Sequence, residues 1–96
     1  MAYHIPDKVY EEICRLAEVY GIRKIILFGS RARGTHSERS DIDIAVSGGD
    51  TDGFYWDVNE NIWSLLPFDI VELDKGITDA LKNEIDKEGI VIYEKT

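Results

Sequence analysis

Two aspartates separated by one residue, Asp41 and Asp43, begin a segment in which polar and apolar side chains alternate. In a β-strand their carboxylates would point to the same face, roughly 6.5–7 Å apart along the backbone. Carboxylates so placed can share divalent cations about 3.5–4 Å apart, the two-metal arrangement for in-line displacement at phosphorus. Aspartate oxygens are also the hard ligands that Mg²⁺ prefers. Taken alone, such a pair is more often two solvated carboxylates on an exposed sheet face.

A Gly-Ser pair, Gly29 and Ser30, favours chemistry at phosphorus over two solvated surface carboxylates. Glycine allows backbone N–H groups to approach a phosphate closely, and the serine hydroxyl adds a donor. Arg31 and Arg33 follow, and planar guanidinium groups match phosphate oxygens, although a solvated connector is the alternative for each. A Walker A loop is excluded because Thr35 stands where the phosphate-binding lysine is required.

A third carboxylate follows in the segment PFDIVEL, where Asp69 is the best candidate. Glu72 would point to the opposite face of a regular strand, and Asp74 would lie beyond its end.

The elements that position these residues follow from periodicity and from helix and strand boundary signals. Helices are expected at 6–20, at 53–66 and from a cap at Thr78 to a stop at Gly89, and strands at 22–28, 41–47, 67–73 and 90–94. Residues 31–40 would connect the first two strands with one helical turn at the start, and 47–53 would form a loop. This order predicts one α+β domain over residues 1–96, with a mixed sheet of about four strands and three helices. The second helix would be the crossover that makes the third strand parallel to the second.

Charge and composition exclude several classes of protein. The net charge of −8 argues against direct nucleic-acid binding, and the only locally positive stretch, residues 21–40, carries five Lys/Arg against one Glu. A small anion held beside metal-binding carboxylates would suit that distribution. No apolar run reaches the roughly 18 residues of a membrane helix, and the start of the chain lacks a signal-peptide core. The single Cys14 forbids an internal disulfide. We therefore expect a soluble, cytoplasmic protein.

The stretch FGSRARGTHSERSDIDIAV resembles the signature of the minimal nucleotidyltransferases of the DNA polymerase β superfamily: Gly-Ser, ten residues, then Asp-x-Asp. PFDIVEL is similar to the strand that supplies that family's third carboxylate, at Asp69. The resemblance implies the polymerase β-like palm fold and transfer of a nucleoside monophosphate, most simply AMP, from an NTP such as ATP to an acceptor hydroxyl. It implies that Asp41, Asp43 and Asp69 hold two Mg²⁺ ions and that Asp69 helps to activate the hydroxyl. It also implies that the Gly-Ser pair and Arg31 bind phosphate, and Arg33 is expected to join them.

The family also implies a partner. Stand-alone members pair with all-helical HEPN proteins as antitoxins in toxin–antitoxin modules, and they neutralise the HEPN toxin by adenylylating a tyrosine, by binding it, or by both. Only 27 residues follow Asp69, so we expect the acceptor to bring its own binding surface and the complex to be a hetero-oligomer. Two alternatives stay open: a catalytically silent antitoxin that acts by contact, and a nucleotidyltransferase acting on a small molecule.

Two tryptophans on the expected 53–66 helix give an independent indication of a partner. Trp56 and Trp63 extend the apolar stripe of that helix beyond the width that a core needs. Aromatic residues beside a core stripe are enriched at interfaces. The alternative is that they cover the sheet edge or the rim of the active site.

Overall fold

The computed structural model describes residues 5–35, 41–62 and 67–95. Its elements are α1 (Asp7–Val19), β1 (Lys24–Phe28), α2 (Ser30–Arg33), β2 (Ile42–Ser47), α3 (Thr51–Asn61), β3 (Phe68–Glu72), the 3₁₀ turn η1 (Leu73–Lys75), α4 (Asp79–Glu88) and β4 (Ile90–Glu94). The strands form one sheet in the order β3-β2-β1-β4. β1 is antiparallel to both β2 and β4, whereas β2 and β3 are parallel. The predicted α+β fold class with a mixed four-stranded sheet is confirmed, and so is the α3 crossover.

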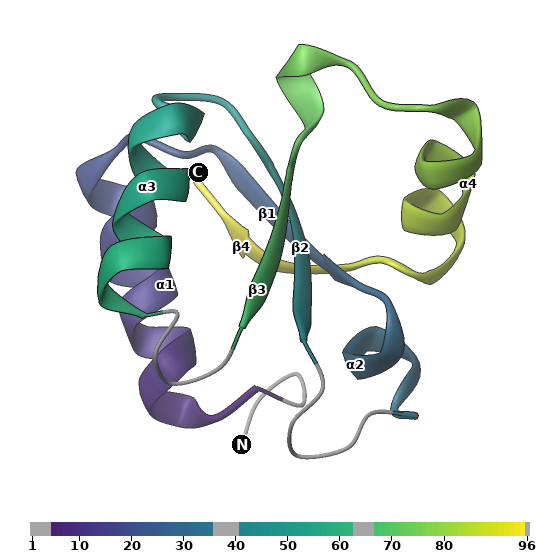
Figure 1. The fold of residues 1–96 in the computed structure, drawn as a ribbon, viewed down its shortest axis with the longest axis horizontal. Coiled ribbons are helices and arrows are strands. Elements are labelled where there is room, and N and C mark those ends of the chain that lie inside the picture. The colour runs from purple at the N-terminus through teal and green to yellow at the C-terminus, as the bar shows by residue number, and fades with distance from the viewer. Residues whose placement is uncertain (1–4, 36–40, 63–66, 96) are drawn as a thin grey trace.

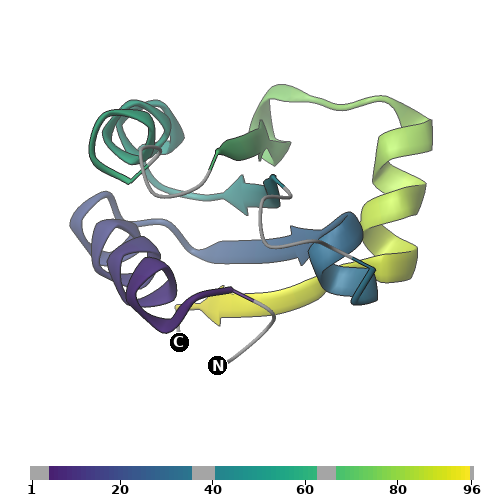
Figure 2. The same cartoon turned by 60° about the horizontal axis from the view of Figure 1, so that its bottom comes forward.

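Helices cover both faces of the sheet. Figure 1 shows α1 and α3 on one side and α4 on the other, with the single turn of α2 at the end of β1, and Figure 2 shows the same separation. Alternate residues of β2 divide between the two faces, because side chains of a strand point in opposite directions in turn. Ile42, Ile44 and Val46 join the larger core with α1 and α3, whereas Ala45 packs with Ile85 of α4. The intervening Asp43 therefore lies on the α4 face.

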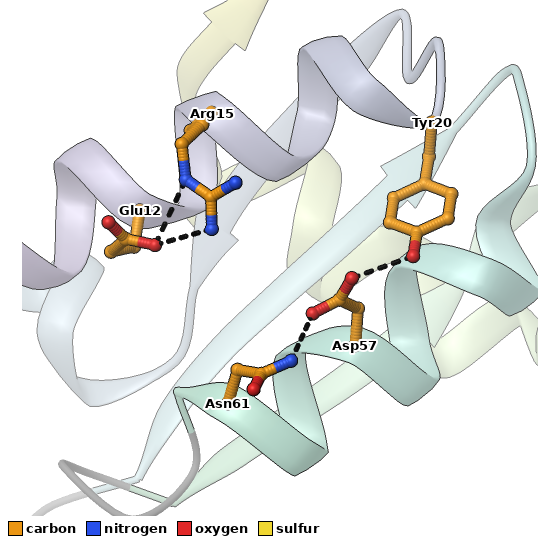
Figure 3. Close-up of polar contacts among 5 residues, drawn as sticks. All are labelled: Glu12, Arg15, Tyr20, Asp57 and Asn61. Atoms are coloured by element: carbon orange, nitrogen blue, oxygen red, sulfur yellow. Dashed lines mark hydrogen bonds and ion pairs between the residues drawn. The ribbon is translucent and has the colours of Figure 1, made fainter.

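Polar contacts join α1 to α3 on the outer side of the larger core. The Tyr20 hydroxyl, just after α1, donates a hydrogen bond of 2.7 Å to the carboxylate of Asp57 on α3 (Figure 3). Asn61 donates to the other oxygen of the same carboxylate, one turn further along α3. The hydrogen bond between Tyr20 and Asp57 is the main reason why the pKa of Asp57 lies below its usual value and the pKa of Tyr20 lies above its usual value. The contact links α1 and α3, the two helices that pack against β2 on the face opposite to α4.

The start of α3 differs from the sequence prediction. The loop expected over 47–53 is shorter, because α3 begins at Thr51, whereas Ser47 ends β2 as the strand prediction over 41–47 had it. The carboxylate of Asp50 accepts a hydrogen bond from the backbone N–H of Gly53, which is a helix N-cap, so the glycine that suggested a loop lies in the first turn. Residues 63–66, the expected end of this helix, lie outside the described residues. None of the described helices is long and apolar enough to cross a membrane.

Candidate functional site

Strand register brings the predicted carboxylates to one end of the sheet. Asp43 is opposite Phe28, the last residue of β1, and on its other side it is opposite Asp69 of β3. Residues opposite each other on neighbouring strands point to the same face, about 4.8 Å apart across the sheet. Asp41 precedes β2 by one residue, at the same end, and is exposed. Two distant segments of the chain thus place Asp43 and Asp69 side by side on the α4 face.

Gly29 lies against the Asp43 carboxylate. Its φ is +74°, a conformation that favours glycine, and a Cβ built on it would overlap the Oδ2 atom of Asp43. The Gly29 carbonyl accepts hydrogen bonds from the N–H groups of Ala32 and Arg33, both at 3.1 Å, which close the turn of α2. Two independent reasons therefore require glycine at this position. Glycine tolerates this φ, and without a Cβ it leaves room for the Asp43 carboxylate.

The two arginines of α2 are placed differently. Arg31 is buried, with 3% of its surface exposed, and burial lowers the pKa of its guanidinium. Arg33 is exposed, and its Nη1 atom donates to Glu88 of α4 at 2.8 Å and lies 3.8 Å from Glu84. Arg33 is therefore the arginine of α2 that reaches the surface beside the carboxylates. A phosphate-binding role for Arg31 stays a prediction.

The pKa of the Asp43 carboxyl depends on its burial and on four charged groups around it. Partial burial is the main cause that raises the pKa of Asp43 to about 6, and the negative charges of Asp69 and Asp41 add to the effect. Glu84 of α4 also raises it, while Arg33 acts in the opposite direction. Sequence analysis missed Glu84, because no motif marks it and only the packing of α4 against the sheet brings it near. The other two predicted aspartates thus both act electrostatically on Asp43.

The donor set can be compared with the requirements of a metal ion. Over residues 5–35, 41–62 and 67–95, no three His, Cys, Asp or Glu side chains are gathered closely enough to hold an ion. The chemistry of the donors nevertheless suits a hard divalent cation, because Asp43 and Asp69 are opposite each other on neighbouring strands and carboxylate oxygens are the ligands that such cations prefer. Burial first, and then the negative charge of Asp69, raises the pKa of Asp43, and a bound cation would offset both effects by stabilising the charged carboxylate.

The other acids near β3 lie elsewhere. Glu72 is opposite Val46, which faces the larger core, so its side chain lies on the face away from Asp69. Asp74 follows the strand in η1 and accepts a hydrogen bond from the N–H of Gly48 at 2.8 Å. Asp69 is thus the acid of this segment that shares a face with Asp43.

Trp56, one of the two tryptophans considered for a partner interface, is 64% exposed on α3. Its ring packs edge-to-face against Tyr55 at a centroid distance of 5.5 Å. Because α3 covers the face opposite to Asp43, Trp56 does not form the rim of the carboxylate site. Trp63 lies outside the described residues.

Known proteins share sequence with this chain. The profile of the Polymerase beta, Nucleotidyltransferase family matches residues 11–96. The chain is 34% identical over 77 residues to the "Putative protein adenylyltransferase MJ0128" of Methanocaldococcus jannaschii, covering 78% of this chain and 76% of that protein.

Solved structures of known proteins have a similar fold. A chain in the crystal structure of a toxin–antitoxin with AMP-PNP matches with a TM-score of 0.72 and 26% identity, over 91% of this chain and 74% of that one. A structure described as "putative minimal nucleotidyltransferase" matches with a TM-score of 0.65 and 28% identity, over 84% of this chain and 86% of that one.

Proposed function

This chain belongs to the Polymerase beta, Nucleotidyltransferase family, and we propose that it transfers AMP from ATP to a hydroxyl group of a protein partner. The observation that carries the proposal is the register that sets Asp43 opposite Asp69, with Gly29 in contact with the Asp43 carboxylate. Carboxylates beside a glycine bend form a site for a metal-bound triphosphate.

The reaction we propose is an in-line displacement at the α-phosphorus of ATP. The oxygen of the acceptor hydroxyl forms a bond to that phosphorus, the bond from the α-phosphorus to the oxygen bridging to the β-phosphorus breaks, and pyrophosphate leaves. The hydroxyl proton passes to the carboxylate of Asp69, which borders the open side of β3 because β3 is an edge strand. Catalysis of this kind is positioning and charge neutralisation, with no covalent enzyme intermediate.

Each residue of the site has a part in this scheme. Asp41, Asp43 and Asp69 would hold Mg²⁺, which when bound neutralises the triphosphate and makes the α-phosphorus more reactive. Gly29 leaves room for the Asp43 carboxylate. Without a side chain, its backbone can also approach the substrate's phosphates closely, and Ser30 offers a hydroxyl donor. Arg33 can exchange its ion pair with Glu88 for a phosphate oxygen, because the pair is exposed and therefore weak.

We further propose that the acceptor is a tyrosine of a HEPN toxin and that this chain is the antitoxin. The motif resemblance and the similarity to a chain of a toxin–antitoxin crystallised with AMP-PNP support this assignment. The similarity to a protein named as an adenylyltransferase supports ATP as the donor and a protein as the acceptor.

The deciding experiment mixes the chain with the proposed HEPN partner, Mg²⁺ and each NTP in turn, and measures the intact mass of both proteins. We expect the partner to gain the mass of AMP with ATP, and to gain nothing with the Asp43→Asn variant. Glu11→Gln is the matched control, because it removes one negative charge from the exposed surface of α1, on the opposite face of the sheet from Asp43 and on a different helix from Trp56. A partner that binds tightly but stays unmodified with every NTP would refute transfer and leave inhibition by contact.

Trp56 gives a second test, directed at the partner surface. We expect Trp56→Ser to weaken the complex at least tenfold, because exposed aromatic residues are frequent anchors of interfaces. ATP binding should stay unchanged, since Trp56 lies on the face away from Asp43. Val19→Ser is the control for the loss of exposed apolar surface, since Val19 is 63% exposed at the end of α1. Calorimetric titration that gives the Trp56 variant the affinity of the parent chain would exclude this surface.

A further inference from the structure

A cavity of about 480 Å³ lies between the sheet and α4. It is lined by Ile26, Leu73, Gly76, Ile77, Asp79, Lys82, Ile85 and Asp86. These residues come from the middle of β1, from η1 with the segment that follows it, and from α4. Figure 1 shows this segment crossing from β3 to α4 on the side of the sheet away from α1 and α3.

The cavity shares its sheet face with the carboxylates. Ile26 is opposite Ala45, and Phe28, two residues further along β1, is opposite Asp43. One alternation along a strand is roughly 7 Å, so the floor of the cavity begins about that far from the Asp43 backbone. α4 also connects the carboxylate site to the cavity. The negative charge of Glu84 raises the pKa of Asp43, and the next residue, Ile85, lines the cavity.

The lining divides into an apolar floor and a charged rim. Ile26, Leu73, Ile77 and Ile85 supply the apolar surface, and they are buried or half-buried. The rim consists of Asp79, Lys82 and Asp86, spaced three and four residues apart and therefore on one side of α4. A cavity of this volume with apolar walls and a few polar groups is typical of sites for small molecules.

We infer that this cavity receives the base of the nucleoside triphosphate, and that the rim carboxylates select a base with an exocyclic amino group, as in adenine. The inference rests on the proposed function, because it assigns a part of that substrate. A base has apolar faces for the isoleucine and leucine floor and an N–H edge for the carboxylates of Asp79 and Asp86. The rim carries two negative charges and one positive, so it repels phosphates, which belong at the other end beside Arg33.

The end of α4 is held by contacts with β1 and α2. A Cβ built on Gly89, at the end of α4, would lie 2.6 Å from a methyl group of Ile26, so the helix end is pressed against the cavity floor. Glu88 pairs with Arg33 of α2 at 2.8 Å. Base and phosphate subsites are therefore held by the same helix, and an ordered cavity is available before the nucleotide binds.

Methyl NMR of the full chain tests the assignment directly. With the isoleucine methyl groups labelled, ATP with Mg²⁺ should shift the resonances of Ile26, Ile77 and Ile85. Inorganic tripolyphosphate with Mg²⁺ should instead shift amide resonances of residues 29–33 and leave those three methyl groups unchanged. Binding of ATP that leaves all three methyl resonances in place would overturn the base assignment alone. Failure of both ATP and tripolyphosphate to bind would overturn the proposed function as well.

A rim variant tests the selectivity. We expect Asp79→Asn combined with Asp86→Asn to weaken ATP binding about tenfold, because hydrogen bonds to charged acceptors are lost. Binding of tripolyphosphate should not weaken, and binding of UTP, which has no exocyclic amino group, should not weaken either. Glu60→Gln is the matched charge control on the opposite face. An equal loss for ATP and UTP would refute recognition of the amino group, and circular dichroism of the variant establishes that it is folded.

Discussion

Replacing Asp43 with asparagine is expected to make the protein more stable while it removes AMP transfer. In the free protein the Asp43 carboxylate is partly buried beside the negative charges of Asp69, Asp41 and Glu84, and its pKa rises from 3.8 to about 6. At neutral pH the fold must therefore hold a carboxylate in its less favourable, charged form. Asparagine has nearly the same shape and removes the charge.

The size of the gain follows from the pKa. A shift of about two units corresponds to about 3 kcal/mol at 1.36 kcal/mol per unit. Asp43 is only partly buried, so solvent screens part of this energy, and we expect about 1.5 kcal/mol. For a domain of this length, that gain raises the melting temperature by roughly 6–12 °C.

The pH dependence carries the sign of the effect. Between pH 4 and 6 the Asp43 carboxyl holds its proton in the folded state and has lost it in the unfolded state. The stability that the folded protein gains by binding this proton is therefore complete below about pH 4. It is lost as the pH rises through about 6. The advantage of Asp43→Asn over the parent chain should therefore be small at pH 4 and complete at pH 7.5.

Denaturant unfolding of both chains at the two pH values, without divalent cations, measures the difference. Titrating groups that do not interact with Asp43 contribute equally to both chains and cancel, so the measured difference belongs to Asp43 together with its charged neighbours. Glu60→Gln, on the opposite face, should show no such pH-dependent gain. Added Mg²⁺ should stabilise the parent chain and not the Asp43 variant, because binding to the folded state alone raises stability. An Asp43→Asn variant that is less stable at pH 7.5, or whose advantage does not change with pH, would refute the electrostatic account.

Two other substitutions have defined outcomes. Gly29→Ala should cost more stability than Gly21→Ala and should abolish transfer: both glycines have positive φ, but only at Gly29 would the new methyl group overlap a carboxylate, that of Asp43. Equal melting temperatures for the two variants would contradict the close approach. Thr78→Ala should cost about 1 kcal/mol because its hydroxyl accepts from the Leu81 N–H, whereas Thr78→Ser should keep the cap, and thermal unfolding that does not separate the two would contradict the capping role.

Local sequence signals predicted most elements of the fold. Thr78 caps α4 and Gly89 ends it, as expected. The prediction for α3 was less accurate, because Gly53 suggested a loop while the Asp50 cap allows the helix to start two residues earlier than expected. Capping is a contact between residues three positions apart, so sequence contains the signal, but the turn composition around it points the other way.

The sequence by itself predicted that Asp41 and Asp43 share a face. It also determined that a Gly-Ser pair precedes them by ten residues and that Asp69 lies in a later strand. These are properties of neighbouring residues, which strand periodicity and motif spacing express directly. Only the tertiary structure decided the rest. Parallel pairing of β2 with β3 set Asp69 opposite Asp43, and packing of α4 brought Glu84 and the cavity to the same face. Those relations join segments far apart in the chain, and burial and charge at a site depend on which distant groups surround it.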